Sequence, residues 1–290
     1  MTCGYDLQFK PRNRKIVRMT RNAKPARVIT ITSGKGGVGK THTTVNLGLA
    51  LAKIGKRVLL LDADLGLANI NIMLGFEPKS TLHDVLNGRA DIRDIIVHYP
   101  AGIDIIPASS GIPEMTMLSE EEKIGLVSAF DQFADEYDYL LIDTAAGIGD
   151  NVLYFSVAAE QILVVIDPEP TSITDAYALI KVLSTKWGTK EFDVVVNRCP
   201  AGSDGRGIFG KLATVAGKFL PVKLNFAGAI SDDPSLSEAV IRQVPLLQLY
   251  PGTKAARDIT RIATNIDSSQ ASRAPKGGLQ FFFRALIENM

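Results

Sequence analysis

The sequence predicts an α/β fold, with a mostly parallel, doubly wound sheet and helices on both faces, from two observations. Short apolar runs rich in Val, Ile and Leu alternate with longer segments of helical periodicity. A glycine-rich stretch follows the first of these runs, at the point where a strand would pass into a helix. Such alternation indicates parallel strands joined by right-handed crossovers.

The apolar runs have the length of strands, and their continuous hydrophobicity indicates burial on both faces. They occupy residues 27–32, 57–62, 103–107, 139–143, 161–167, 192–197 and 222–230. Helices are expected between them at residues 41–54, 119–136, 150–159, 172–187 and 235–244. We therefore expect a basic tail over 1–26, one domain over 27–266, a linker over 267–278 and a short helix over 279–290.

The composition is that of a soluble globular protein, with 46% hydrophobic and 22% charged residues in a chain of 290. A formal net charge of +1 provides no overall attraction to nucleic acid, so a nucleic-acid partner is not expected. Cys3 and Cys199 form no disulfide framework and no metal-ligand pair, which favours a reducing compartment. No secretory signal or apolar run of about 18 residues is apparent, so a cytoplasmic location is expected.

The expected tail is strongly basic between residues 10 and 24. Asp6 is the one acidic residue before Ala26. The basic residues are Lys10, Arg12, Arg14, Lys15, Arg18, Arg21 and Lys24. The tail could bind lipid, act on a protein partner, or be disordered without a function of its own.

The glycine-rich stretch fits the phosphate-binding P-loop pattern through Gly34, Gly39, Lys40 and Thr41. Glycines let backbone N–H groups curl around phosphate oxygens, and the following helix N-terminus adds partial positive charge. Lys40 is expected to reach the β and γ phosphates of a nucleotide, and the Thr41 hydroxyl to bind Mg²⁺. The residues expected around the phosphates are Gly34, Lys35, Gly36, Gly37, Val38, Gly39, Lys40, Thr41 and His42.

Acidic residues stand at the ends of two expected strands. Asp62 and Asp64 follow the second strand, and Asp143 ends the strand over residues 139–143. Ligands of open parallel sheets lie beyond the carboxyl ends of the strands, so these acids are expected to face the P-loop. An apolar strand that ends in Asp, about a hundred residues after a P-loop, is typical of a magnesium-binding element.

A second lysine, Lys35, gives residues 34–41 a resemblance to the deviant Walker A motif of the MinD/ParA family. That resemblance implies an ATPase in which Lys35 crosses a dimer interface to the other subunit's ATP and acts with Lys40. It also implies that Asp64 orients the attacking water and that Asp62, with Thr41 and Asp143, serves the magnesium site. Adenine contacts are implied for Asn197, Arg198, Ser231 and Asp233.

Three further stretches, residues 64–71, 143–150 and 167–181, resemble the FlhG (FleN) group of that family, which limits flagellar number. The resemblance implies a cytoplasmic protein that joins the inner face of the cell membrane peripherally as an ATP-bound homodimer. It implies an FlhF-type GTPase, flagellar switch components and, in some bacteria, a flagellar transcription activator as partners. The N-terminal GTPase-stimulating stretch of many such proteins is absent from the tail, which places that activity in doubt.

The last twelve residues carry one apolar stripe at helical spacing. It consists of Leu279, Phe282, Phe283, Leu286, Ile287 and Met290. A helix this short is expected to order only on docking, either on a membrane surface or on the protein's own core.

Rival functions in the same fold are a metal-cluster scaffold, a MinD-type or ParA-type positioning ATPase in division or DNA partition, and a binding module without catalysis. A metal cluster needs paired thiolates, which two separated cysteines do not supply. DNA partition needs a basic face on the folded domain. Asp64 argues against a module without catalysis, because a purely structural nucleotide site needs no water-orienting carboxylate.

Overall fold

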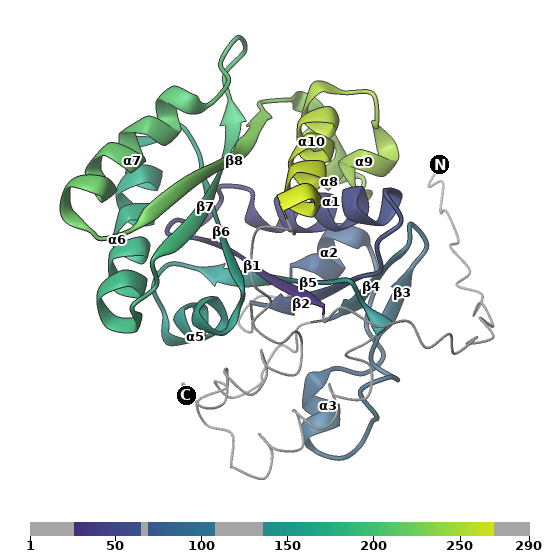
Figure 1. Ribbon diagram of the computed structural model, residues 1–290. Coiled ribbons are helices and arrows are strands. Elements are labelled where there is room, and N and C mark those ends of the chain that lie inside the picture. Colours follow the sequence, from purple (N-terminus) through teal and green to yellow (C-terminus); the bar gives the residue numbers. More distant parts are fainter. Residues whose placement is uncertain (1–25, 65–68, 108–135, 270–290) are drawn as a thin grey trace.

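The computed structural model describes residues 26–64, 69–107 and 136–269 and shows one eight-stranded sheet between two layers of helices (Figure 1). The strands are β1 (Arg27–Ser33), β2 (Val58–Ala63), β3 (Val97–Tyr99), β4 (Ile103–Ile106), β5 (Tyr139–Ala146), β6 (Gln161–Ile166), β7 (Glu191–Cys199) and β8 (Lys223–Ser231). The longer helices are α1 (Lys40–Lys53), α5 (Asp150–Ala158), α6 (Pro170–Trp187), α7 (Arg206–Phe219), α8 (Pro234–Ile241) and α10 (Lys254–Ser268). Short helices are α2 (Ile70–Leu74), α3 (Leu82–Leu86) and α9 (Leu246–Leu249).

The strand order is β3-β4-β2-β5-β1-β6-β7-β8, and every pair is parallel except β3 with β4. The mostly parallel, doubly wound α/β fold predicted from the sequence is therefore confirmed. β1, which leads into the P-loop, lies between β5 and β6 in the middle of the sheet. The carboxyl ends of β1, β2 and β5 consequently meet at one edge, where the predicted site residues stand.

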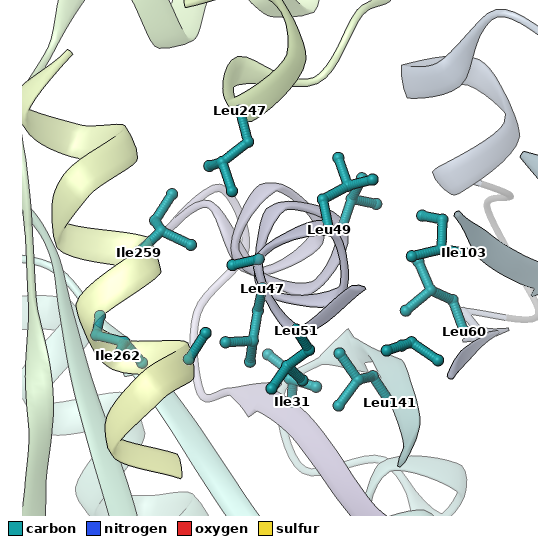
Figure 2. Close-up of a cluster of buried hydrophobic side chains, with 14 of the residues drawn as sticks. Ile31, Leu47, Leu49, Leu51, Leu60, Ile103, Leu141, Leu247, Ile259 and Ile262 are labelled. Atoms are coloured by element: carbon teal, nitrogen blue, oxygen red, sulfur yellow. The ribbon is translucent and has the colours of Figure 1, made fainter. Parts of the chain in front are cut away.

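Alternate residues of the central strands serve the two helical layers. Ile29 and Ile31 of β1 pack with α1, α9 and α10 on one face, in a cluster shown in Figure 2. On the other face, Ile162 and Val164 of β6 pack against α5, α6 and α7. Burial on both faces explains why the strands appear in the sequence as unbroken apolar runs.

Helix α1 is buried along almost its whole length, with every residue from Thr43 to Leu51 inaccessible to solvent. Helix α1 lies between the sheet and the pair α9 and α10. It is therefore apolar on both sides, whereas a helix on the protein surface carries a single apolar stripe. Its polar Asn46 is satisfied internally: the side-chain oxygen accepts from the Leu247 N–H at 3.0 Å, and the amide donates to the His42 carbonyl at 2.9 Å. The helix that follows the P-loop therefore has a fixed position.

Several elements differ from the sequence prediction. β3, α2, α3, α7, α9 and α10 were not predicted. Helix α10 extends to Ser268, two residues beyond the expected domain boundary at 266. Of the expected helix over 119–136, residues 119–135 lie outside the described residues, as do the basic tail through residue 25 and the C-terminal segment 270–290. No helix in the described part of the chain is long and apolar enough to cross a membrane.

Candidate functional site

The P-loop connects the end of β1 to the start of α1 at the edge where the central strands end. Gly39, the residue before α1, has φ +89, a left-handed conformation that favours glycine. A β-carbon on Gly39 would also lie 2.3 Å from the side-chain nitrogen of Asn197. Both the backbone conformation and the available space therefore require glycine at this position.

Asn197, near the end of β7, holds the P-loop from the side. Its side-chain amide donates to the Val38 carbonyl at 2.8 Å, while its Oδ1 is buried without a hydrogen-bond partner in the described structure. The sequence analysis expected Asn197 to contact adenine, and the free Oδ1 is compatible with that expectation. The anchoring of the loop by Asn197 was not anticipated.

Asp143, on β5, is completely buried beside the first turn of α1. It accepts hydrogen bonds from the hydroxyls of Thr41 at 2.6 Å and Thr44 at 3.0 Å, and its Oδ1 lies 3.8 Å from the Lys40 ammonium. Burial raises the pKa of the Asp143 carboxyl, while Lys40 and the two hydroxyls oppose that shift. The sequence analysis expected Lys40, Thr41 and Asp143 to lie close together, as they do in the structure. It did not identify Thr44 as a further partner of Asp143.

Asp62 is the next-to-last residue of β2 and lies directly opposite Asp143 in the register of β2 and β5. Its carboxylate accepts the backbone N–H groups of Asn69 and Ile70, both at 3.0 Å, and so orders the start of α2. Burial, followed by the neighbouring Asp143 charge, raises the pKa of Asp62 to about 7 despite these donors. Asp62 therefore shapes the loop after β2 as well as lying near the P-loop acids.

Asp64 lies at the start of the loop after β2, partly exposed. Its backbone N–H donates to Asp62 at 3.2 Å, and its carboxylate accepts from the Asn69 side chain at 3.0 Å. Asp64 is close enough to Asp143 to raise the pKa of that buried carboxyl. Residues 65–68, which continue this loop, lie outside the described residues.

The oxygen atoms around Asp143 suit a small hard cation. Mg²⁺ prefers oxygen ligands and is usually held by one or two carboxylates together with substrate phosphates. Thr41, Asp62 and Asp143 provide a hydroxyl and two carboxylates beside the P-loop. Within the described ranges, no group of three or more His, Cys, Asp or Glu residues could hold a metal alone, so a cation here would depend on a nucleotide's phosphates.

A cavity of about 140 Å³ opens beside the P-loop between β7, β8 and α8. Its polar lining includes His42, Asn197, Arg198 and Asp233. Burial, with a smaller effect from Arg198, lowers the pKa of His42, so its imidazole is neutral near pH 7. This is the position at which the base of a nucleotide is expected.

Ser231 does not belong to the lining of this cavity. Its hydroxyl donates to the Asp258 carboxylate of α10 at 2.7 Å, and its backbone N–H donates to the same oxygen at 3.1 Å. The expected contact of Ser231 with a nucleotide therefore remains a prediction. Asp233 lies on the cavity wall, but its carboxylate also caps α8 by accepting from the Ser235 N–H at 3.0 Å.

Lys35 lies on the outer side of the P-loop and is partly exposed. Its ammonium group donates to Glu169, the residue before α6, and to the Thr171 hydroxyl at 3.1 Å. The carboxylate of Glu169 raises the pKa of Lys35. Lys35 therefore faces the outside of the molecule, unlike the buried Lys40.

The expected membrane residues at 279–290 lie outside the described part of the chain.

Comparison with known proteins identifies relatives over nearly the whole chain. An AAA domain family model matches residues 26–192. The chain is 46% identical to the antiactivator FleN of Pseudomonas aeruginosa over 265 residues, which covers 91% of this chain and 95% of FleN. It is 34% identical to the flagellum site-determining protein YlxH of Helicobacter pylori, covering 92% of each chain.

A solved structure shares the fold at similar coverage. The septum site-determining protein MinD of Pyrococcus horikoshii, complexed with Mg-ADP, superposes with a TM-score of 0.68 at 29% identity. The match covers 86% of this chain and 99% of MinD. The site residues therefore stand in a fold that binds a magnesium nucleotide in this relative.

Substitution of Gly34 tests how tightly the P-loop is packed. A β-carbon there would lie 2.2 Å from the backbone carbonyl of Asp175 on α6, whereas one on Gly36 would meet nothing within 4 Å. Gly34→Ala is expected to lower the free energy of unfolding by about 1–3 kcal/mol through overpacking. Gly36→Ala, the matched control in the same loop, should change it by less than about 0.5 kcal/mol. Equal midpoints in urea denaturation would contradict the close contact between loop and helix.

Proposed function

The chain belongs to the FlhG (FleN) group of MinD/ParA-type P-loop ATPases, and on that premise we propose that it regulates the number and placement of flagella. In this proposal it is a magnesium-dependent ATPase that switches between a monomer and an ATP-bound dimer. The observation that carries the flagellar role is the 34% identity to the flagellum site-determining protein YlxH over 92% of each chain. The 46% identity to the antiactivator FleN, over 95% of that relative's length, supports a regulatory role. ATP hydrolysis itself follows from membership of the family.

The phosphate end of ATP would lie over the first turn of α1. Lys40 is held by α1 only 3.8 Å from Asp143, so its charge is positioned before ATP arrives. Thr41, Asp143 and Asp62 would hold Mg²⁺, which neutralises phosphate charge during transfer. The Asn197 amide binds the Val38 carbonyl, so this carbonyl is held away from the phosphates. The backbone N–H groups of the loop would then bind the phosphates.

Asp64 is proposed to orient the water that attacks the γ phosphate. It is the partly exposed member of the acid group, whereas Asp62 and Asp143 are buried and occupied by backbone or hydroxyl donors. Asn69 fixes the Asp64 carboxylate by donating to one of its oxygens, which leaves the other oxygen for water. A positioned carboxylate of this kind contributes to hydrolysis without being needed for binding.

Asp64→Ala is expected to reduce steady-state ATP hydrolysis about 100-fold or more while ATP binding is retained. The reason is that Lys40 and the magnesium ligands remain when the water loses its orienting partner. Phosphate release and isothermal calorimetry measure the two properties separately. Asp204→Ala, which removes a largely exposed carboxylate of the loop before α7, is the control and should hydrolyse ATP normally. Normal turnover in Asp64→Ala would contradict the assigned role.

Lys35 is proposed to contact the ATP of the partner subunit. Its position on the exposed side of the P-loop supports this, because a lysine that serves only its own nucleotide would be buried like Lys40. In the single chain its ammonium group is engaged by Glu169 and Thr171. Dimerisation with ATP would therefore require Lys35 to exchange these partners for phosphate oxygens.

Lys35→Ala is expected to bind ATP with nearly unchanged affinity yet remain a monomer. Size-exclusion chromatography with light scattering, in ATP and in ADP, measures the mass directly. Lys56→Ala is the matched control, since it also removes an ion-paired lysine but one that contacts Asp267. The wild type and the control should double in mass in ATP. A dimer of Lys35→Ala in ATP would refute the contact across the interface, and a monomeric wild type would refute the switch.

We also propose that the ATP dimer associates peripherally with the inner face of the cell membrane through the C-terminal stripe. One short apolar helix gives marginal, reversible binding. Two such helices on one dimer bind far better, because the second meets the surface at high effective concentration.

The expected partners are an FlhF-type GTPase, flagellar switch components and a flagellar transcription activator. The antiactivator FleN supports an activator among these partners, and the flagellum site-determining protein YlxH supports a role at the flagellum.

Phe282→Glu is expected to abolish ATP-dependent sedimentation with anionic liposomes while leaving the ATP dimer intact. It places a charge in the apolar stripe, and the polar face offers a matched control in Gln280→Glu, which adds the same charge and should still sediment. If Phe282→Glu unfolds or no longer dimerises, the stripe packs on the protein's own core and the membrane proposal is wrong.

A MinD-type or ParA-type role in division or DNA partition is the alternative within the same family. The similarity to MinD structures is equally compatible with this alternative at the level of the fold. Salt-dependent binding of random duplex DNA by the ATP dimer would favour partition over flagellar control.

A further inference from the structure

A short loop between β5 and α5, residues 147–149, lies at the edge of the sheet that carries the P-loop. Its central residue, Ile148, is 51% exposed, although isoleucine is usually buried in a folded protein. A β-carbon on either neighbour, Gly147 or Gly149, would meet no atom of the described residues within 4 Å. Ile148 therefore leaves half of its apolar surface in water, on a loop that the described part of the chain does not cover.

The 147–149 loop is fixed beside the start of the P-loop. β1 lies between β5 and β6, so the segments that follow β5 and β6 flank the P-loop on its two sides (Figure 1). On the β5 side, the Gly147 N–H donates to the Ser33 carbonyl at 2.9 Å. The Ser33 hydroxyl donates in turn to the Lys35 carbonyl at 2.9 Å. Ile148 and Lys35 consequently lie on the same edge, each held through Ser33.

The exposed charges at this edge have both signs. Lys35 and Arg198 are cations, whereas Glu169 and Asp150, the first residue of α5, are anions. A surface of mixed sign offers no net attraction to an anionic membrane or to nucleic acid. It suits a second copy of the same surface, because in a two-fold contact the cations of one copy can meet the anions of the other.

We infer that Ile148 is the apolar anchor of the contact between two copies of this chain in the ATP-bound dimer. The inference rests on the proposed dimer, and it adds an apolar contact to the polar one assigned to Lys35. For Lys35 to reach the partner's ATP, the two edges must face each other closely, and the 147–149 loops beside the two lysines would then be covered. Removing both isoleucines from water stabilises the dimer through the hydrophobic effect. Interfaces derive most of their affinity from a few such buried side chains.

The dissociation constant of the ATP dimer tests the anchor, measured by sedimentation equilibrium on the full chain. Ile148→Ser is expected to raise this constant about tenfold or more, because each dimer loses two apolar contacts. Ile148→Leu keeps the apolar volume and should stay within about threefold of the wild type. Calorimetry should show unchanged ATP affinity in both variants, since Lys40 and the magnesium ligands are untouched.

Ile54→Ser is the matched control. Ile54 is 41% exposed, so it resembles Ile148 in type and in exposure. It follows the last residue of α1, at the opposite edge of the sheet from the P-loop. This variant should dimerise like the wild type.

Hydrogen exchange of the wild-type protein reads the burial of the loop without a substitution in it. Amide exchange at residues 147–149 is expected to slow about fivefold in ATP relative to ADP, at protein concentrations above the dissociation constant. The same measurement on Lys35→Ala, which is expected to bind ATP as a monomer, separates cover by the partner from cover by the chain's own nucleotide. In that variant the additional protection should be absent.

An Ile148→Ser dimer as tight as that of the wild type would overturn the inference and leave the proposed dimer in place. A wild type that stays monomeric in ATP would overturn both. Equal weakening by Ile54→Ser, or equal protection of the loop in monomeric Lys35→Ala, would show that Ile148 does not contact a second copy. If Ile148→Ser dimerises normally but no longer sediments with anionic liposomes, the loop meets lipid and the assignment to a second copy is wrong.

Discussion

The buried carboxylate of Asp143 is the constraint on which the nucleotide edge of this molecule depends. A charge that is fully removed from water requires compensation by hydrogen bonds or an opposite charge. Here the compensation comes from Lys40, Thr41 and Thr44, all within the first five residues of α1. Satisfying one acid on β5 therefore fixes the start of α1 and, with it, the end of the P-loop. The same groups that stabilise the fold are those that a magnesium nucleotide would contact.

A second acid beside the first makes this arrangement responsive to a cation. Asp62 and Asp143 are adjacent in register, and each raises the free energy of ionising the other in their buried surroundings. Asp62 also holds the backbone N–H groups of Asn69 and Ile70. A divalent cation that relieves the repulsion would consequently act on the same carboxylate that orders the loop after β2. Asp64, in that loop, would be positioned by the same event.

The sequence predicted the parts of this structure that depend on local pattern. Apolar runs identified the buried strands, and the P-loop pattern identified Lys40 and Thr41. Helix α10 was overlooked although Ala255, Ile259, Ile262 and Ile266 are spaced for one buried face, so the signal was present. The anchoring role of Asn197 could not be predicted, because its partner Val38 is 159 residues away in the sequence. The place of Ile148 beside Lys35 likewise depends on which strands are neighbours.

The first turn of α6 connects the exposed side of the P-loop to its buried side. Glu169 and Thr171 hold Lys35, while the backbone of Asp175, one turn later, lies against Gly34 with no room for a side chain. Because packed elements move as units, a change of partners at Lys35 would shift α6 and so change the packing at Gly34. Dimer contact and phosphate binding would then act on one rigid junction. In the proposed dimer, this junction would couple the partly exposed Lys35 to the P-loop that binds the phosphates.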